Sequence, residues 1–182
     1  IQSLSYLLIE TTNLQAWADY AKDVVGLMKN DSLSNEQNLY LRMDEKFFRF
    51  HITMGDSQKF LAAGFSLSDK AAFEEAKKEL DHANIDYEDL DDEIAKLRCV
   101  EECIGLHDPA GNRLELSYGC KDSSEPFVST QDIQGFITKG LGFGHVVFAA
   151  PDLEPAHRFY IDVLGFGDSD YMNFPMGPAP DA

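Results

Sequence analysis

Hydrophobic residues recur near the start of the chain first in the manner of a strand and then in the manner of a helix. Residues 4–10 are rich in Leu, Ile and Tyr and predict a strand. Apolar positions in residues 14–25 share one helical face, and Gly26 is a suitable place for a helix to stop. Thr12 and Gln15 have the spacing of a capping box. A helix that follows Thr12 is therefore expected.

Further strands follow, and the same order of elements then returns. Residues 47–54 alternate between apolar and polar side chains, which predicts a sheet with one buried face. The acidic residues 88–93 predict a solvated loop. Residues 108–112 predict a hairpin turn, because proline presets φ and the glycine and asparagine after it tolerate positive φ. The other predicted elements are strands at 38–43, 60–67, 85–87, 98–106 and 113–118, and a helix from Asp69 to Asn84.

A polar segment without sustained periodicity, residues 121–139, separates these elements from a second start of the same pattern. Shifting the sequence by 139 residues places Leu14 on Leu153 and Gly26 on Gly165, which indicates a duplicated unit. The predicted organisation is a first domain at 1–120, a linker at 121–139 and the start of a second domain at 140–182.

The second copy contains only one predicted strand and the helix at 152–164. The apolar face of this helix has no sheet of its own to cover, and a lone strand and helix are not stable in isolation. We therefore expect the sequence to be part of a longer protein, in which the helix covers a sheet formed by downstream residues.

Composition excludes several classes of partner. Acidic residues outnumber basic ones by 32 to 15, which gives a formal charge of −17 and argues against nucleic acid and anionic membranes as partners. The apolar content of 44% is that of a folded globular protein. No apolar run reaches the roughly 18 residues of a spanning helix. Three cysteines without a metal-binding spacing indicate reduced thiols and a cytoplasmic location.

Histidines are the best candidates for chemistry, because the sequence has no phosphate loop, nucleophile elbow or zinc-protease motif. His51 is expected to be a partly exposed strand residue. His145 stands out, because glycines beside it allow close backbone approach and strand alternation points it to the same face as Val147. The residues alone leave a structural role and a ligand role for His145 both open.

Two longer motifs favour the ligand role. The run Gly144-His145-Val146-Val147-Phe148, followed by Pro151-Asp152-Leu153, resembles the opening of a vicinal oxygen chelate (glyoxalase-like) domain. The run Asp108-Pro109-x-Gly111-Asn112-x-x-Glu115 resembles the closing strand of such a domain. Together they resemble the type I extradiol ring-cleavage dioxygenases of the 2,3-dihydroxybiphenyl 1,2-dioxygenase kind. The resemblance implies an α+β fold of paired βαβββ modules.

The resemblance also implies where iron would bind. In that family only the C-terminal domain holds Fe(II), and the histidine of its first strand is a ligand, which matches His145. A second histidine and a glutamate complete the site, and neither has a counterpart before Ala182. The acid and base residues would also lie beyond Ala182. Val147 and Met172 are candidates for the substrate pocket, with ordinary packing as the alternative.

The first domain has its own version of these positions. Glu115 occupies the place of the glutamate ligand, and Tyr6 aligns with His145. A phenol with a pKa near 10 is a poor ligand for a divalent metal at neutral pH. We therefore interpret Glu115 as a structural relic and expect the first domain to hold no metal.

The implied activity is extradiol cleavage of a catechol or biphenyl-diol by O₂, in a cytoplasmic homo-oligomer of aromatic catabolism. Two imidazoles and one carboxylate on one face of Fe(II) leave open positions for the diol and O₂. With one ligand only, the 182-residue chain alone should bind iron weakly and be inactive. The alternatives are another metal-dependent glyoxalase-like enzyme and a non-catalytic module that binds a small hydrophobic molecule.

The offset predicts where the missing carboxylate ligand lies. If the second domain repeats the first, the equivalent of Glu115 falls at about position 254, within roughly ten residues. A histidine on an intervening strand should complete the site with His145. Determining the sequence after Ala182 tests this prediction, and the absence of both residues would favour the binding module.

Overall fold

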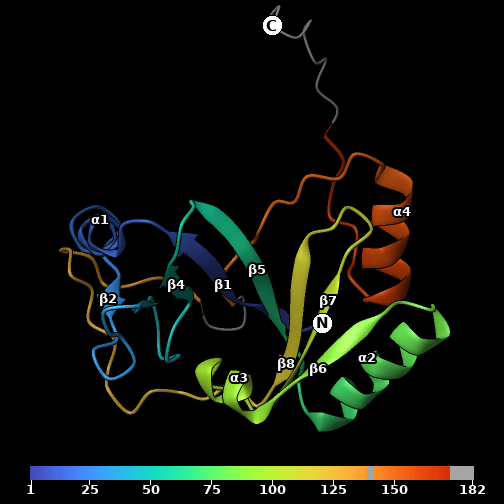
Figure 1. Ribbon diagram of the computed structural model, residues 1–182, viewed down its shortest axis with the longest axis horizontal. Helices are drawn as coiled ribbons and strands as arrows, with labels where there is room; N and C mark the ends of the chain where they lie inside the picture. The colour runs from blue at the N-terminus through green and yellow to red at the C-terminus, as the bar shows by residue number, and fades with distance from the viewer. Residues whose placement is uncertain (139–141, 173–182) are drawn as a thin grey trace, which may run out of the picture.

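Eight strands form one mixed sheet in the order β2-β3-β4-β1-β5-β8-β7-β6 (Figure 1). The structure is a computed structural model that describes residues 1–138 and 142–172. In chain order the elements are β1 (Ser3–Thr11), α1 (Leu14–Tyr20), η1 (Ala21–Val25), β2 (Met28–Lys29), β3 (Asn38–Arg42), β4 (Phe50–Met54), β5 (Lys59–Ser66), α2 (Lys70–His82), β6 (Tyr87–Leu90), α3 (Asp92–Leu97), β7 (Glu102–His107), β8 (Arg113–Tyr118), α4 (Leu153–Arg158) and η2 (Phe159–Val163).

The sheet consists of two modules with the same strand order. In the first module β1 pairs in parallel with β4, and β3 and β2 follow in antiparallel pairing. In the second module β5 pairs in parallel with β8, and β7 and β6 follow in the same way. The two modules join through antiparallel pairing of β1 with β5. The predicted α+β fold of paired βαβββ modules is therefore confirmed.

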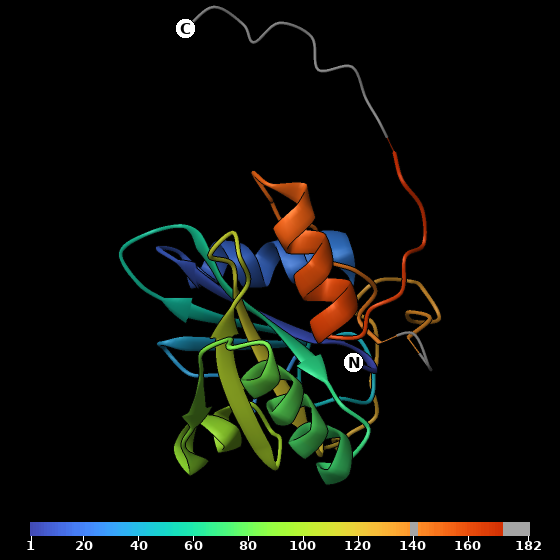
Figure 2. The same cartoon turned by 90° about the vertical axis from the view of Figure 1, so that its right-hand side faces the viewer.

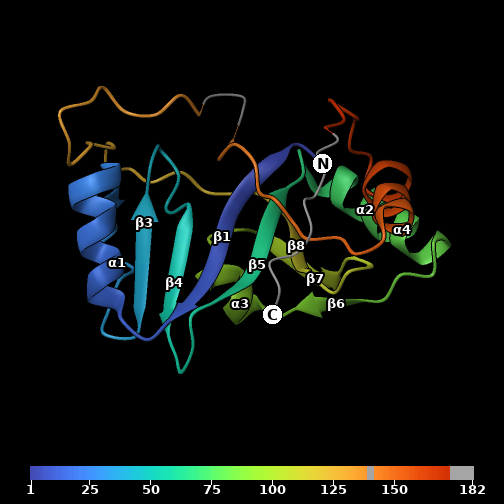
Figure 3. The same cartoon turned by 90° about the horizontal axis from the view of Figure 1, so that it is seen from above.

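Helices cover the outer face of each half of the sheet (Figure 3). Continuous with η1, the helix α1 packs its apolar residues against β3 and β4, while α2 packs against β5 and β8. Gly26 ends η1 in the left-handed conformation, as predicted. The predicted start of α1 is wrong by one residue, because the side chain of Asn13, rather than Thr12, accepts the amide of Ala16.

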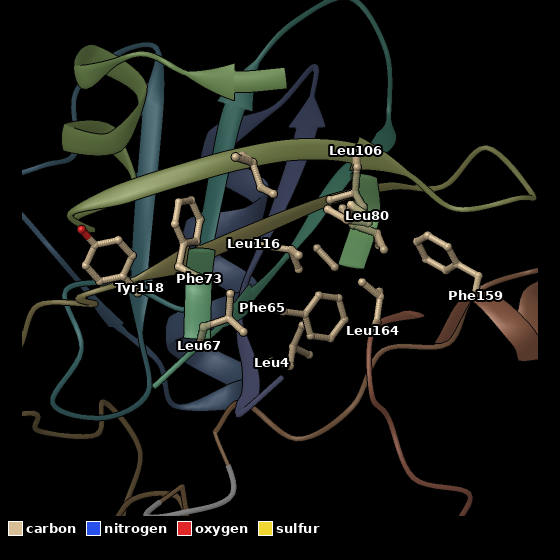
Figure 4. Packing of buried hydrophobic residues seen from close by; sticks show 13 residues of the cluster. Leu4, Phe65, Leu67, Phe73, Leu80, Leu106, Leu116, Tyr118, Phe159 and Leu164 are labelled. Atoms are coloured by element: carbon tan, nitrogen blue, oxygen red, sulfur yellow. The ribbon is translucent and has the colours of Figure 1, made fainter. Parts of the chain in front are cut away.

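The helix formed by α4 and η2 lies beside α2 on the outside of the second module (Figures 1 and 2). Its residues Phe159 and Leu164 are buried in the same cluster as Phe65 and Leu80 (Figure 4). These two side chains are therefore buried without a downstream sheet, and the expectation that the helix covers such a sheet stays a prediction. The apolar edge of the second module provides the cover, while Leu153 remains 69% exposed.

Two predictions for residues 85–106 are wrong. The acidic residues predicted as a loop form β6 and the start of α3, because an edge strand needs hydrogen bonds on one side only and leaves its carboxylates in water. Asp91 caps α3 by accepting the amide of Ile94. The strand predicted from Arg98 begins only at Glu102, since Cys99 has a positive φ of 55° and turns the chain.

The prediction of one buried face around β4 is also wrong. Phe50 and Ile52 pack toward α1, but His51 on the opposite face is only 4% exposed. Phe48 precedes the strand and packs against Tyr6 on that same inner face. Both faces of the sheet are therefore buried here, and the inner face is where polar residues gather.

Residues 142–150 form a turn followed by an irregular stretch, without pairing as a strand in the part of the chain that the structure describes. The strand predicted around His145 is therefore not present there. The predicted alternation of side chains is nevertheless present. Val146 and Phe148 pack against the cluster that contains Phe65 and Leu80, which we call the first core cluster, whereas His145 and Val147 are exposed.

The polar segment predicted as a linker is held against the first module over its described residues, 121–138. The hydroxyl of Thr130 and the amide of Gln131 donate to the carbonyl of Lys22 at 2.7 and 2.8 Å, and Ser129 donates to Gly26. These bonds satisfy carbonyls at the end of η1. The fully buried guanidinium of Arg42 donates to the Glu125 carbonyl at 2.8 Å. No helix within residues 1–138 and 142–172 is long and apolar enough to span a membrane.

Candidate functional site

The inner face of the sheet brings together Tyr6 of β1 and Glu115 of β8, the two residues at the family's ligand positions. The phenol of Tyr6 donates to Oε2 of Glu115 at 2.7 Å, and both side chains are buried. Gly64 of β5 makes room for this contact, since a Cβ there would overlap the Tyr6 ring. The equivalent positions of the first domain are thus adjacent, as the sequence motifs predicted, but they bind each other.

Arg98 supplies the positive charge at this point. Its Nε lies 2.7 Å from Oε2 of Glu115 and its Nη2 lies 3.1 Å from Oε1, so the pair is bidentate. The side chain of Glu115 is 2% exposed and that of Arg98 is 12% exposed. The sequence pattern predicts a strand from Arg98 and no role at Glu115, whereas Arg98 is the residue that follows α3.

His51 completes the buried network. Its Nε2 is 2.8 Å from Oδ1 of Asn38, and its Nδ1 is 3.4 Å from Nη1 of Arg98. These partners fix the neutral tautomer in which Nε2 donates to Asn38 and Nδ1 faces the guanidinium. Burial, with the charge of Arg98, lowers the pKa of His51 to about 3. The prediction of a partly exposed histidine is wrong, because Tyr40 stacks on the ring at 4.0 Å and shields it.

The chemistry of this donor set does not suit a divalent cation. Burial and the neighbouring Glu115 raise the pKa of Tyr6 well above its ordinary value, so the phenol stays protonated. Both carboxylate oxygens of Glu115 already accept hydrogen bonds from Arg98. A guanidinium therefore sits beside the carboxylate that would otherwise bind a metal, and the cluster is structural.

His145 lies in a different environment, on the wall of a cleft of about 730 Å³. The cleft is formed by the N-terminal residues 1–4, the irregular segment 144–150, α4 and η2. His145 is exposed. Val147 is 83% exposed and Met172 is 72% exposed, and neither lines this cleft. Their roles stay predictions.

The residues present fit one ligand position of an iron site. An exposed imidazole is a suitable donor for Fe(II). Within residues 1–138 and 142–172 there is no group of three His, Cys, Asp or Glu residues that could hold a metal ion. His145 therefore fits one ligand position, and further ligands would have to come from outside the described residues.

Comparisons with known proteins give the family. Residues 4–55 match the family model described as dihydroxybiphenyl dioxygenase BphC D1. The chain is 35% identical over 175 residues to an iron-dependent extradiol dioxygenase of Rhodococcus jostii (strain RHA1), covering 96% of this chain and 58% of that protein. It is 32% identical over 179 residues to a biphenyl-2,3-diol 1,2-dioxygenase of Paraburkholderia xenovorans (strain LB400), covering 98% and 59%.

A solved structure agrees. The crystal structure of a catechol 2,3-dioxygenase superposes with a TM-score of 0.85 at 33% identity, over 91% of this chain and 55% of that one. The chain is similar to extradiol dioxygenases in sequence and in fold. It spans slightly less than three fifths of the length of the two curated relatives, 58% and 59%.

The buried pair predicts a large loss of stability when one partner is removed. Replacing Arg98 by Met should lower the free energy of unfolding by about 3–5 kcal/mol, because Glu115 stays buried without its cation. Adding Glu115→Gln should recover most of the loss, since the amide oxygen still accepts from Tyr6. Urea unfolding of the two single variants and the double variant measures this. Equal stability of Arg98→Met and the parent would contradict it.

The low pKa of His51 predicts a stability that falls with acid. The unfolded chain binds the proton below pH 6.5, whereas the folded chain resists it down to about pH 3. His51 therefore contributes a decrease of up to about 1.4 kcal/mol in unfolding free energy per pH unit below 6.5. Urea unfolding at pH 7, 6 and 5 should show a smaller decrease for His51→Gln than for the parent. Parallel pH dependences of the two proteins would refute this assignment.

Proposed function

We propose that the intact protein is an Fe(II)-dependent extradiol dioxygenase that cleaves a catechol-type ring with O₂. The observation that supports this most is the match of nearly the whole chain to relatives with that activity in their names, at 35% identity over 96% of the chain in one case. Other relatives are named for 3-methylcatechol and for 1,2-dihydroxynaphthalene. The shared feature of these substrates is a vicinal diol on an aromatic ring.

In this proposal residues 1–120 form a metal-free N-terminal domain, 121–139 a linker and 140–182 the start of the catalytic domain. His145 is one iron ligand, and Val147 and Met172 contribute to the substrate pocket. Residues 139–141 and 173–182 lie outside the described structure. The boundary between residues 139 and 140 therefore rests on the sequence. A cytoplasmic location and a homo-oligomeric state are part of the same proposal.

Three observations support His145 as a ligand. It faces a cleft, it is exposed, and its neighbours Val146 and Phe148 turn toward the first core cluster. The imidazole is thus free to meet groups from outside the first domain. Bound Fe(II) would supply a centre at which an aromatic diol and O₂ come together. What this chain contributes is one imidazole, held on a segment that packs against the N-terminal domain.

Replacing His145 by Ala in the intact protein tests the proposal. Loss of one of three protein ligands should lower the iron content more than about tenfold and remove ring cleavage of 2,3-dihydroxybiphenyl. The first domain should stay folded, because its core does not use this side chain. Iron analysis and the absorbance of the ring-opened product measure the outcome.

His82→Ala provides the matched control, since His82 is an exposed histidine at the end of α2 and does not line the cleft. It should keep iron and activity at the level of the parent. Full iron content and turnover in His145→Ala would show that His145 is an ordinary surface residue.

A further inference from the structure

The hairpin turn between β7 and β8 holds its own shape. The amide of Asp108 donates to the Asn112 carbonyl at 2.9 Å, and the amide of Gly111 donates to the Asp108 carbonyl at 2.9 Å. Oδ1 of Asp108 accepts the amides of Ala110 and Asn112 at 2.9 and 2.8 Å. One carboxylate oxygen therefore builds the turn. The other, Oδ2, accepts the side-chain amide of Asn112 within the turn, and both groups also make a contact outside it.

Both of these groups bind the segment that follows the linker. Oδ2 of Asp108 accepts the Tyr160 hydroxyl at 2.8 Å and the Asn112 amide at 2.8 Å. The same Asn112 amide lies 3.2 Å from the carbonyl of Ala149. Asp108 is only 5% exposed although it is charged. We name Asp108, Asn112 and Tyr160 the hairpin latch.

Aromatic contacts fix the same segment at both sides of His145. The ring centroids of Phe143 and Phe50 of β4 are 4.7 Å apart, and those of Phe148 and Phe60 of β5 are 5.9 Å apart. Such pairs are favourable at these separations. Along the chain His145 thus lies between Phe143 and Phe148, which we call the aromatic anchors. It also comes four residues before Ala149, whose carbonyl the latch binds.

The irregular segment donates one backbone hydrogen bond to the sheet, from Phe143 to the carbonyl of Leu4 at 3.0 Å, and lacks the ladder of hydrogen bonds that holds a strand in place. A metal ligand nevertheless has to be held to within a fraction of an ångström of its productive position. The latch and the aromatic anchors are the contacts that meet this requirement here. Asp108 and Tyr160 also line the same cleft as His145.

We propose that the hairpin latch is a positioning device, through which the metal-free first domain sets the placement of His145. The inference rests on the proposed role of His145 as an iron ligand. Burial and the nearby carboxylate of Asp108 raise the pKa of Tyr160, so the hydroxyl remains a donor throughout the physiological range. The first domain therefore contributes to the metal centre without touching the metal.

Tyr160→Phe in the intact protein removes only the hydroxyl of the latch. Tyr118→Phe is the matched control, because the Tyr118 hydroxyl also donates to a carboxylate, Glu102, at 2.6 Å and belongs to the same core cluster, but makes that bond within the first domain. Asn112→Ala removes the bond to Ala149 and serves as a second test of the latch.

The first measurement is amide hydrogen exchange of Phe143 and Phe166 in metal-free protein, because these two amides donate to the carbonyls of Leu4 and Tyr160 at 3.0 and 2.9 Å. Tyr160→Phe and Asn112→Ala should each speed exchange there about tenfold, as expected for the loss of one hydrogen bond that resists local opening. Tyr118→Phe should leave it unchanged. The second measurement is the rate at which iron passes to an external chelator. This rate should rise about tenfold in the two latch variants and not in the control.

Unchanged exchange at Phe143 and Phe166 in both latch variants would overturn the inference. Faster exchange with an unchanged rate of iron release would also overturn it, because the latch would then hold the segment without positioning the ligand. His145→Ala separates the two proposals. If His145→Ala keeps its iron, the assignment of His145 as a ligand fails. If His145→Ala loses its iron but Tyr160→Phe releases iron as slowly as the parent, only the role of the latch fails.

Discussion

A buried carboxylate is costly unless a cation and hydrogen bonds compensate its charge, and the inner face of this sheet is arranged around one such group. Glu115 lies on β8 near the centre of the sheet, and Arg98 donates hydrogen bonds to both of its carboxylate oxygens. Tyr6, His51 and Asn38 extend the network across β1, β4 and β3. Polar groups from both modules are therefore tied to one ion pair, which connects the two halves of the sheet.

This ion pair also separates the tasks of the two domains. A phenol and a carboxylate meet at the middle of the inner face, and a guanidinium beside them provides the positive charge. These groups are largely buried, so the inner face is closed to solvent at this point. His145, by contrast, lies on an exposed irregular segment whose packing depends on the outer face of the first domain. The buried ion pair and the exposed imidazole therefore lie in two different environments, one closed to solvent and one open to it.

The sequence was informative where local periodicity and packing agree. The helix over 14–25 and β8 at Arg113–Tyr118 follow their patterns, because their apolar faces are buried by neighbours. Pattern reasoning missed β6, since an edge strand in water can be as acidic as a loop. It also missed Arg98, whose partner Glu115 comes close only after α3 and β7 have formed. His145 was found through a motif, whereas Tyr160 has no local signal of its partner 52 residues earlier.

The attachment of residues 121–138 has a consequence for the modular inheritance of such domains. These residues end the first helix by binding the carbonyls of Lys22 and Gly26, and they accept a hydrogen bond from Arg42. In a recombination event, a crossover within residues 121–138 would combine the end of η1 from one parent with part of the contacting segment from another. A crossover after Thr138 would move the whole set of contacts together. The contacts of residues 121–138 with the first domain are thus inherited as one set only when the crossover lies after them.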